Sequence, residues 1–269
     1  MAIITISRGT FSGGQRLAES IAEKLGYRCL ARVAIVQQAA KRYGVSEDKI
    51  TKAIDESPGV LEHLRSDRRR FLAFVRAALV NEVKDDKVVY HGLAGHFLLS
   101  GVPNVLKVRV IANMEFRIKA AMDRGHLTRE DAKQAIKKMD YKRTRWTKFL
   151  YGIDWDDPSP YDLVINLNQI SLSSACEIVC HTVSLDSFKT PPGWQKTMGN
   201  LTLSTEVKAI IAAHKNIADA GVEIEADGGV ITLGGTVASP EHADEIREVV
   251  RAIPGVKDIN SKMQVRHQG

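Results

Sequence analysis

The sequence predicts an α/β domain, with a mostly parallel sheet covered by helices on both faces, followed by a small α+β module of order αββαβ. Over residues 1–187, short apolar runs alternate with amphipathic stretches, which is typical of parallel strands joined by helices. Over residues 203–269, a hairpin pattern lies between two helical ones. Residues 188–202 contain Pro191-Pro192-Gly193 and no periodicity, so we expect a linker there.

The chain opens with a strand, a glycine-rich turn and a helix. Residues 2–6 form a short apolar run, glycines follow from Gly9 to Gly14, and residues 15–25 show a helical period that stops at Gly26. This order begins a βαβ unit. Successive backbone N–H groups point inward at such a turn, and the helix N-terminus adds partial positive charge. We therefore expect it to bind an anion.

The remaining elements follow from periodicity and turn residues. In the first domain we expect helices over residues 33–43, 46–55, 67–84, 114–124, 128–149 and 171–185, and strands over residues 88–90, 105–111 and 162–166. In the second we expect a helix over residues 203–218, a hairpin over 222–233 that turns at Asp227-Gly228-Gly229, a helix over 240–253 capped by Ser239, and a strand over 259–265.

The positive charge is concentrated in the first domain. The whole chain carries +6, whereas residues 196–269 hold 8 basic and 10 acidic residues, so residues 1–195 carry +8. This excess suits a phosphate-rich ligand. It would also suit nucleic acid, but no nucleic-acid-binding motif is present and we expect no such partner.

The N-terminus, Met1 to Ile6, shows neither a basic start nor a cleavage site, and no apolar run approaches the roughly 20 residues that span a bilayer. We therefore expect a cytoplasmic location and no membrane attachment.

Cys176 and Cys180 lie one helical turn apart beside His181. A metal site there would be short of ligands, which favours small apolar residues on the buried face of a helix.

The glycine turn matches part of the P-loop pattern G-x-x-x-x-G-K-[ST]. Gly9 and Gly14 occupy the two glycine positions, while Gln15 and Arg16 stand where the pattern has lysine and a hydroxyl residue. We expect the backbone amides from Ser12 through Gly13 to Gln15 to bind phosphates, with Arg16 beside them. The alternative is a glycine turn that only allows close packing.

Several segments resemble the cytidylate kinase-like family, a branch of the nucleoside monophosphate kinases, over about residues 1–185. They are residues 7–18, 22–27, 103–106, 137–140, 142–145, 151–155, 157–158 and 161–166. That branch typically has serine-arginine followed by a Ser-Gly-Gly loop without the lysine. The resemblance implies a P-loop kinase fold, with phosphoryl transfer from ATP to a nucleotide such as CMP in the presence of Mg²⁺.

The resemblance also implies a lid of basic helices. Arg117, Arg143 and Arg145 are its candidates for gripping the transferring phosphoryl group, because a guanidinium pairs with phosphate oxygens bidentately. Asp140 would pair with one of them, and Asp162 would help to position the lid. The alternative is that residues 128–148 are a solvated basic face.

Two departures from the family concern the acceptor nucleotide. Ala31-Arg32 stands where the family often has Asp-Arg, and Gly92-Leu93-Ala94 where it often has Gly-Arg-Gly. The remaining acceptor candidates are Arg32, Arg69, Arg70, Arg76 and His91. For at least one of Arg69, Arg70 and Arg76, the alternative is a place on a solvated helix face. His91 and His96 flank the changed turn and either substitute for the lost groups or are structural. A catalytically degenerate nucleotide sensor is therefore the alternative to an enzyme.

The C-terminal module resembles the BON domain over residues 203–266, through residues 222–237, 243–250 and 253–260. BON domains are associated with phospholipid surfaces or protein partners. Because this module is acidic, electrostatic attachment to anionic lipid is not expected. We expect an accessory domain that binds a protein or small ligand, or one that only stabilises or dimerises the chain.

Overall fold

The computed structural model describes residues 2–55, 62–92, 95–125, 127–214, 217 and 221–265. The chain divides into two compact units. The first comprises Met1–Ile35, Asp55–Pro58 and Asp85–Pro191, and the second Val36–Ile54, Gly59–Lys84 and Pro192–Gly269. Within the described ranges, no helix combines the length and apolar character needed to cross a membrane.

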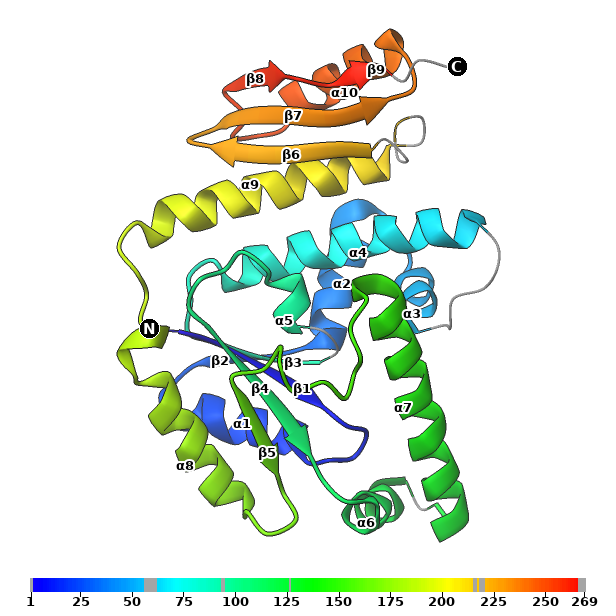
Figure 1. The fold of residues 1–269 in the computed structure, drawn as a ribbon, viewed down its shortest axis with the longest axis vertical. Coiled ribbons are helices and arrows are strands. Elements are labelled where there is room, and N and C mark those ends of the chain that lie inside the picture. The colour runs from blue at the N-terminus through cyan, green and yellow to red at the C-terminus, as the bar shows by residue number, and fades with distance from the viewer. Residues whose placement is uncertain are drawn as a thin grey trace. The chain divides into compact units, whose positions relative to one another are not determined.

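A five-stranded parallel sheet forms the first unit (Figure 1). Its strands are β1 (Ile3–Arg8), β2 (Arg28–Ala31), β3 (Val88–His91), β4 (Val105–Ile111) and β5 (Leu163–Asn166). They lie in the order β2-β3-β1-β4-β5, with every neighbouring pair parallel. The predicted parallel sheet is confirmed. Arg8 pairs with Val110 and Ile6 with His91, so the carboxyl ends of β1, β3 and β4 meet at one edge.

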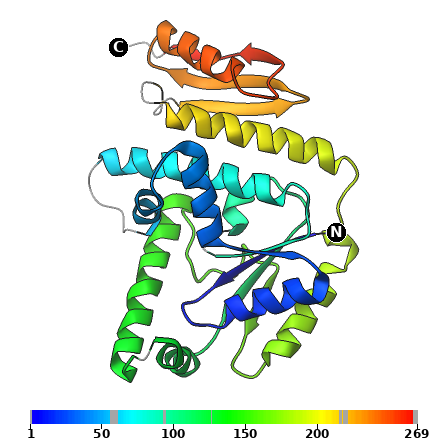
Figure 2. The ribbon, with the colours of Figure 1, turned by 180° about the vertical axis from the view of Figure 1, so that it is seen from behind.

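Helices lie on both faces of this sheet. α1 (Gly14–Leu25) and α8 (Leu172–Val183) pack against each other and against one face, and Figure 2 shows α1 in front of the strands. α5 (Gly95–Leu98) contacts β1 on the other face, near Thr5 and Tyr90. Cys176 and Cys180 are buried in the α8 core, which confirms their interpretation as part of a packed helix face.

The basic stretch after β4 forms two helices of the first unit. α6 (Met114–Gly125) and α7 (Arg129–Tyr151) pack together through Ile118, Ala121, Ala132 and Ile136. The side chain of Thr128 caps α7 by accepting a hydrogen bond from the Asp131 backbone N–H at 3.2 Å. This cap fixes where α7 begins.

The second unit combines helices from the first half of the chain with the C-terminal module. It contains α2 (Arg32–Tyr43) from Val36 onward, α3 (Glu47–Asp55), α4 (Glu62–Val83) and α9 (Trp194–Ala213). α4 packs along α9, and Glu206 of α9 pairs with Arg42 and accepts a hydrogen bond from Tyr43. Helix α9 therefore joins the C-terminal module to α2 and α4.

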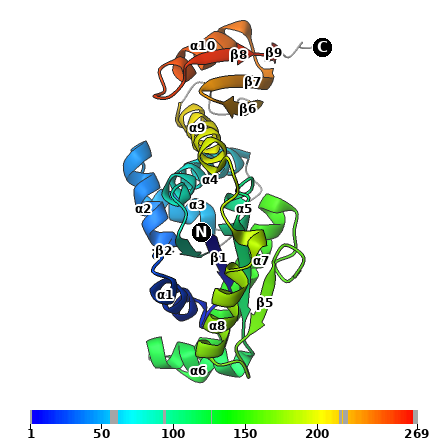
Figure 3. The same ribbon diagram turned by 90° about the vertical axis from the view of Figure 1, so that its left-hand side faces the viewer.

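The C-terminal module has the predicted order of elements. β6 (Gly221–Asp227) and β7 (Val230–Val237) form an antiparallel hairpin, α10 (Pro240–Arg251) follows, and β8 (Asp258–Ser261) and β9 (Gln264–Val265) pair in parallel with β7. α9 and α10 share one apolar core with the sheet, and Figure 3 shows this module from the side.

The segment expected to be a linker is largely helical. A 3-10 turn covers Asp186–Phe188, and α9 starts at Trp194, nine residues before the predicted helix. Gly193, at φ 78°, precedes the helix in a left-handed conformation. Trp194 and Met198 are buried, and the Trp194 indole N–H donates to the carbonyl of Lys84. Tertiary burial of these two side chains thus extends a helix that shows no periodicity in the sequence.

Candidate active site

The glycine loop joins β1 to α1 and carries backbone donors without acceptors. Phe11 and Gly13 adopt left-handed backbone conformations, at φ 59° and 85°. Among the described residues, the backbone N–H groups from Gly13 to Arg16 have no hydrogen-bond acceptor. Because these groups form the N-terminus of α1, they remain available to an anion, and the anion site stays a prediction of the sequence.

Side chains are excluded from the centre of the loop by close packing. A Cβ atom on Gly13 would lie 3.0 Å from Leu167 Cδ1, and one on Gly14 would lie 2.7 Å from Arg8 Cβ. Ser12 is fully buried and its hydroxyl donates to the Val110 carbonyl at 3.1 Å, so it anchors the loop to β4. Its contribution to an anion site is its position in the turn rather than its hydroxyl group.

Asp140 connects α7 to the loop. Its Oδ1 accepts hydrogen bonds from the Thr10 hydroxyl at 3.0 Å and the Thr10 backbone N–H at 3.4 Å. Its Oδ2 accepts from Arg117 at 2.5 Å, and Arg117 also donates to the Thr10 carbonyl at 2.7 Å. The predicted pairing of Asp140 with a lid arginine is present, and Thr10 is a partner that sequence reasoning missed.

Arg143 reaches the loop from the same helix. It donates to the Arg8 carbonyl at 3.1 Å and lies 4.0 Å from Asp140. Burial, together with the neighbouring Arg8, lowers the pKa of Arg143 to about 10. Arg145 lies exposed two residues along α7 and contacts Tyr141 of its own helix. The structure therefore brings Arg117 and Arg143 to the loop, but not Arg145.

The two residues that replace the P-loop lysine and hydroxyl do not reach across the loop. The Gln15 amide donates to Glu19 one turn along α1, at 3.0 Å. Arg16 is exposed. Six loop residues were predicted to bind phosphate, and among the described residues those from Gly13 to Arg16 offer free backbone N–H groups. Ser12 anchors the turn, and Gly9 begins it.

The acceptor candidates are divided between the two units. Arg32 and His91 belong to the first unit, whereas Arg69 and Arg76 lie on α4 in the second. His91 is buried at the end of β3 with its Nδ1 unpartnered, and burial followed by the charge of Arg8 lowers its pKa. Asp162 accepts from the Lys107 backbone N–H and pairs with its side chain, so it joins β5 to β4.

His96 belongs to an aromatic cluster. It is buried, neither ring nitrogen has a partner within the described residues, and its ring centre lies 4.6 Å from that of Tyr161. Burial, with Lys107 and Arg109 nearby, lowers the pKa of His96 to about 4. These contacts favour the structural interpretation. Leu93 and Ala94 of the adjoining turn lie outside the described residues.

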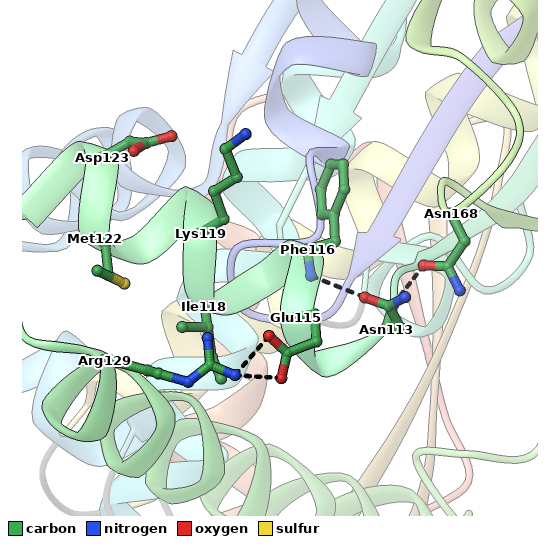
Figure 4. Close-up of a pocket in the computed structure, with 9 residues that line it drawn as sticks. All are labelled: Asn113, Glu115, Phe116, Ile118, Lys119, Met122, Asp123, Arg129 and Asn168. Atoms are coloured by element: carbon green, nitrogen blue, oxygen red, sulfur yellow. Dashed lines mark hydrogen bonds and ion pairs between the residues drawn. The ribbon is translucent and has the colours of Figure 1, made fainter.

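A pocket of about 480 Å³ opens beside the loop at the start of α6 (Figure 4). The exposed ring of Phe116 lines it, and this ring lies 3.9 Å from where a Cβ atom on Gly13 would be. Asn113 Oδ1 accepts from the Phe116 N–H, and Asn168 Oδ1 accepts from the Asn113 N–H, both at 2.8 Å. The two amide NH₂ groups remain as donors for a ligand. Only the helix-capping role of Asn113 could have been anticipated from the sequence.

Comparisons with known proteins agree with this geometry. The cytidylate kinase-like family matches residues 3–169, and the BON domain matches residues 200–267. A cytidylate kinase from Archaeoglobus fulgidus is 27% identical over 188 residues, which are 69% of this chain and 97% of that protein. One from Pyrococcus horikoshii is 27% identical over 177 residues, 66% of this chain and 85% of that protein.

A solved structure supports the fold of the first domain. The crystal structure of an uncharacterized protein from Eubacterium ventriosum is similar with a TM-score of 0.52, at 18% identity, over 68% of this chain and 98% of that one.

Proposed function

Because the chain belongs to the cytidylate kinase-like family, we propose that it transfers the γ-phosphoryl group of ATP to a nucleoside monophosphate such as CMP. The bond from the γ-phosphorus to the β–γ bridging oxygen would break, and a phosphate oxygen of the acceptor would bond to that phosphorus, giving ADP and a nucleoside diphosphate. The contacts of Arg117 with Thr10 of the loop, and of Arg143 with Arg8 directly before it, carry this proposal.

The chain's own groups would bind and orient the phosphates. The free N–H groups from Gly13 to Arg16 would hold phosphate oxygens of the donor at the helix N-terminus. Arg117 and Arg143 would stabilise charge on the group being transferred, because both guanidinium groups are mostly shielded from water. Asp140 would position Arg117 and the Thr10 backbone.

The chain offers few ligands for Mg²⁺ around the loop. Arg16 stands at the hydroxyl position, and both oxygens of Asp140 are already engaged. No cluster of three or more metal-ligating side chains occurs in the part of the chain that the structure describes. Bound Mg²⁺ neutralises phosphate charge; we propose that it arrives with ATP and is held by phosphate oxygens and water.

The pocket beside Phe116 would take the base of the donor nucleotide. A nucleobase can stack on the exposed ring while the amides of Asn113 and Asn168 donate to its edge. Stacking contributes about 1–3 kcal/mol per base, so Phe116→Ala should raise the KM for ATP about tenfold and leave kcat within about twofold. Ile178→Ala, which removes a similarly exposed apolar side chain from α8, is the control. An unchanged KM would contradict this use of the pocket.

The acceptor would be bound by Arg32 and His91 of the first unit, while roles for Arg69 and Arg76 of α4 stay predictions from the sequence. We propose a nucleotide acceptor because these groups are cationic or donate hydrogen bonds, with CMP expected from the relatives named cytidylate kinase. The family's aspartate is replaced by Ala31 and its arginine by Leu93, so the choice of base is a question for direct assay.

The deciding experiment couples ADP release to a spectroscopic assay, with each nucleoside monophosphate as acceptor, beside thermal shifts induced by ATP and by each acceptor. Turnover with CMP supports the proposal. Turnover with another acceptor corrects the base. A thermal shift without turnover for any acceptor overturns the enzyme and supports the nucleotide sensor.

We propose that the BON domain is an accessory domain that binds a protein or small ligand. Binding would influence helix α4, against which α9 packs. Helix α4 carries Arg69 and Arg76. A partner bound to the module could therefore alter acceptor binding in either the enzyme or the sensor. Partner-dependent change in the KM of the acceptor is the measurement that tests it.

A further inference from the structure

The loop lacks a cation at the position that the P-loop pattern gives to lysine. Gln15 stands there, and its side chain is hydrogen-bonded to Glu19 along the exposed side of α1. In the P-loop that lysine neutralises the β- and γ-phosphates. A kinase built on this loop therefore needs the same charge from another residue.

Arg8, the last residue of β1, lies against the start of α1. A Cβ atom on Gly14 would be 2.7 Å from Arg8 Cβ and 3.0 Å from Arg8 Cδ. The Arg8 side chain therefore passes directly over Gly14, where only hydrogen leaves enough room. The same glycine begins the run of free N–H groups at the helix N-terminus.

Arg8 is partly buried, and desolvation together with the nearby Arg124 lowers its pKa, while Glu19 acts in the opposite direction. The Nε of Arg8 has no hydrogen-bond partner, and no carboxylate forms an ion pair with it among the residues that the structure describes. Its charge acts on Tyr90 and His91 at the end of β3, and on Arg143 of α7. The guanidinium group thus lies between the loop and the carboxyl ends of the central strands.

Other polar atoms near Arg8 are also unsatisfied. Within the described ranges, neither the fully buried Tyr90 hydroxyl group nor Nδ1 of the buried His91 has a partner. A partly buried guanidinium group whose Nε has no partner among the described residues has lost hydration without full replacement, and the neighbouring Arg143 adds like charge. An anion placed between Arg8 and Arg143 would relieve this cost.

We propose that Arg8 takes the place of the P-loop lysine, with its guanidinium group binding phosphate oxygens of the donor nucleotide above Gly14. This inference rests on the proposed nucleotide kinase function. The planar guanidinium can bind two oxygens at once, so it can span the β- and γ-phosphates. Gly14 is then required both for the helix N-terminus and for the passage of the Arg8 side chain.

Two substitutions separate charge from packing. Arg8→Met keeps the aliphatic contact with Gly14 and removes the charge, whereas Arg8→Lys keeps the charge. Arg8→Met should raise the KM for ATP at least about tenfold and lower kcat about 100-fold, and Arg8→Lys should recover most of the loss in kcat. Lys138→Ala removes an exposed charge from α7 and serves as the control. Arg8→Met with both constants within about threefold of the parent would overturn the proposal.

A binding measurement keeps this test separate from the proposed function. ATP should raise the Tm of the parent protein but not that of Arg8→Met, whether or not any acceptor is phosphorylated. If the parent shows the shift without turnover, the kinase function fails and the role of Arg8 in binding stands. If both proteins show the same shift, the role of Arg8 fails. If neither shows a shift, both proposals fail.

A second variant tests the close approach. Gly14→Ala should displace the Arg8 side chain, so it should weaken ATP binding about as much as Arg8→Met. The double variant should be no weaker than either single one, because the two changes act on the same contact. Additive losses of ATP binding would show that Gly14 and Arg8 act independently. They would overturn the proposal that the Arg8 side chain must pass over Gly14. The Tm without nucleotide reports whether the variants fold.

Discussion

Around the glycine loop, several buried polar atoms have no partner, whereas the core of the C-terminal module is built almost entirely from apolar side chains. Arg8 Nε, the Tyr90 hydroxyl group and His91 Nδ1 are unsatisfied near the loop. In the module, Ile231, Leu233 and Ile246 are fully buried in an apolar cluster. Unsatisfied groups are costly unless a ligand completes them, so the loop region is arranged for binding and the module core for stability.

The two regions also differ in backbone conformation. The loop places the non-glycine residue Phe11 at φ 59° and packs Gly14 against Arg8. In the module, left-handed conformations fall on glycines such as Gly228 and Gly229 of the hairpin turn, where they cost little. Asp86 and Lys87, in the turn before β3, share this backbone conformation, so strain is present at the loop but is not confined to it. Because the loop has the unsatisfied polar atoms and the module core is apolar, substitutions in the two regions should affect different measurements.

The largest expected effect comes from Arg143→Ala. The guanidinium group contacts the loop at the Arg8 carbonyl and is buried beside like charges. Its removal should lower kcat about 10³-fold, the scale of an arginine that stabilises a transferring phosphoryl group. The Tm should hardly change, because the variant loses a hydrogen bond but also a poorly compensated charge. Steady-state kinetics with ATP and the preferred acceptor checks this.

Lys138→Ala is the matched control on α7, and Arg145→Ala should cause a much smaller loss than Arg143→Ala because that side chain is exposed. If Arg143→Ala kept kcat within about threefold of the parent, Arg143 would have a structural role. The loop region would then no longer differ from the core of the C-terminal module in its importance for catalysis.

Protonation of His96 gives the next largest effect. The folded-state pKa of about 4 lies below the value of 6.5 expected when the chain is unfolded. The unfolded state thus binds the proton first as pH falls, so stability that is present above pH 6.5 is lost toward pH 4. The shift corresponds to about 3 kcal/mol of unfolding free energy.

His96→Phe keeps an aromatic ring beside Tyr161 but cannot take up a proton. Urea unfolding at pH 7 and at pH 4.5 should show a smaller loss of stability for the variant than for the parent. Equal losses would show that His96 remains solvated. His91, whose pKa is also lowered, contributes in the same direction in both proteins.

Local patterns predicted most of the fold. The strand expected over residues 105–111 has the same bounds as β4, and α10 begins at Pro240 after the Ser239 cap, as expected. These features depend on neighbouring residues only. The start of α9 was missed because Trp194 and Met198 are its only buried side chains in residues 194–202, and the indole partner at Lys84 is distant in sequence.

The same distinction holds within the candidate site. An anion-binding turn could be predicted because its N–H groups belong to one strand–turn–helix segment. The contact between Thr10 and Asp140 spans 130 residues and leaves no sequence pattern. Successive residues of an α-helix are about 100° apart, so Arg143 and Arg145 leave α7 in nearly opposite directions. Only tertiary packing decides which of the two faces the loop.

The smallest effect is expected from Glu206→Ala. This substitution tests the contact between α2 and α9, which we expect to contribute to stability and not to phosphoryl transfer. Both carboxylate oxygens of Glu206 are engaged, by Arg42 at 2.9 and 3.2 Å and by the Tyr43 hydroxyl group at 2.9 Å. Burial and Glu206 raise the pKa of Tyr43, so the phenol stays protonated and donates. Its ring also stacks on Phe74 at 4.4 Å. This contact joins α2 to α9 within the second unit.

Removal of the Glu206 carboxylate should lower the unfolding free energy by about 1–2 kcal/mol, since hydrogen bonds to a charged group are lost where solvent is only partly available. The Tm should fall by about 3–6 °C, while the KM for ATP stays within about twofold of the parent. Glu225→Ala, which removes an exposed glutamate from β6 of the same module, should change neither quantity. A change in the acceptor KM alone would show that the contact between α2 and α9 serves acceptor binding as well as stability. That outcome would require the C-terminal module to be treated as part of the catalytic apparatus.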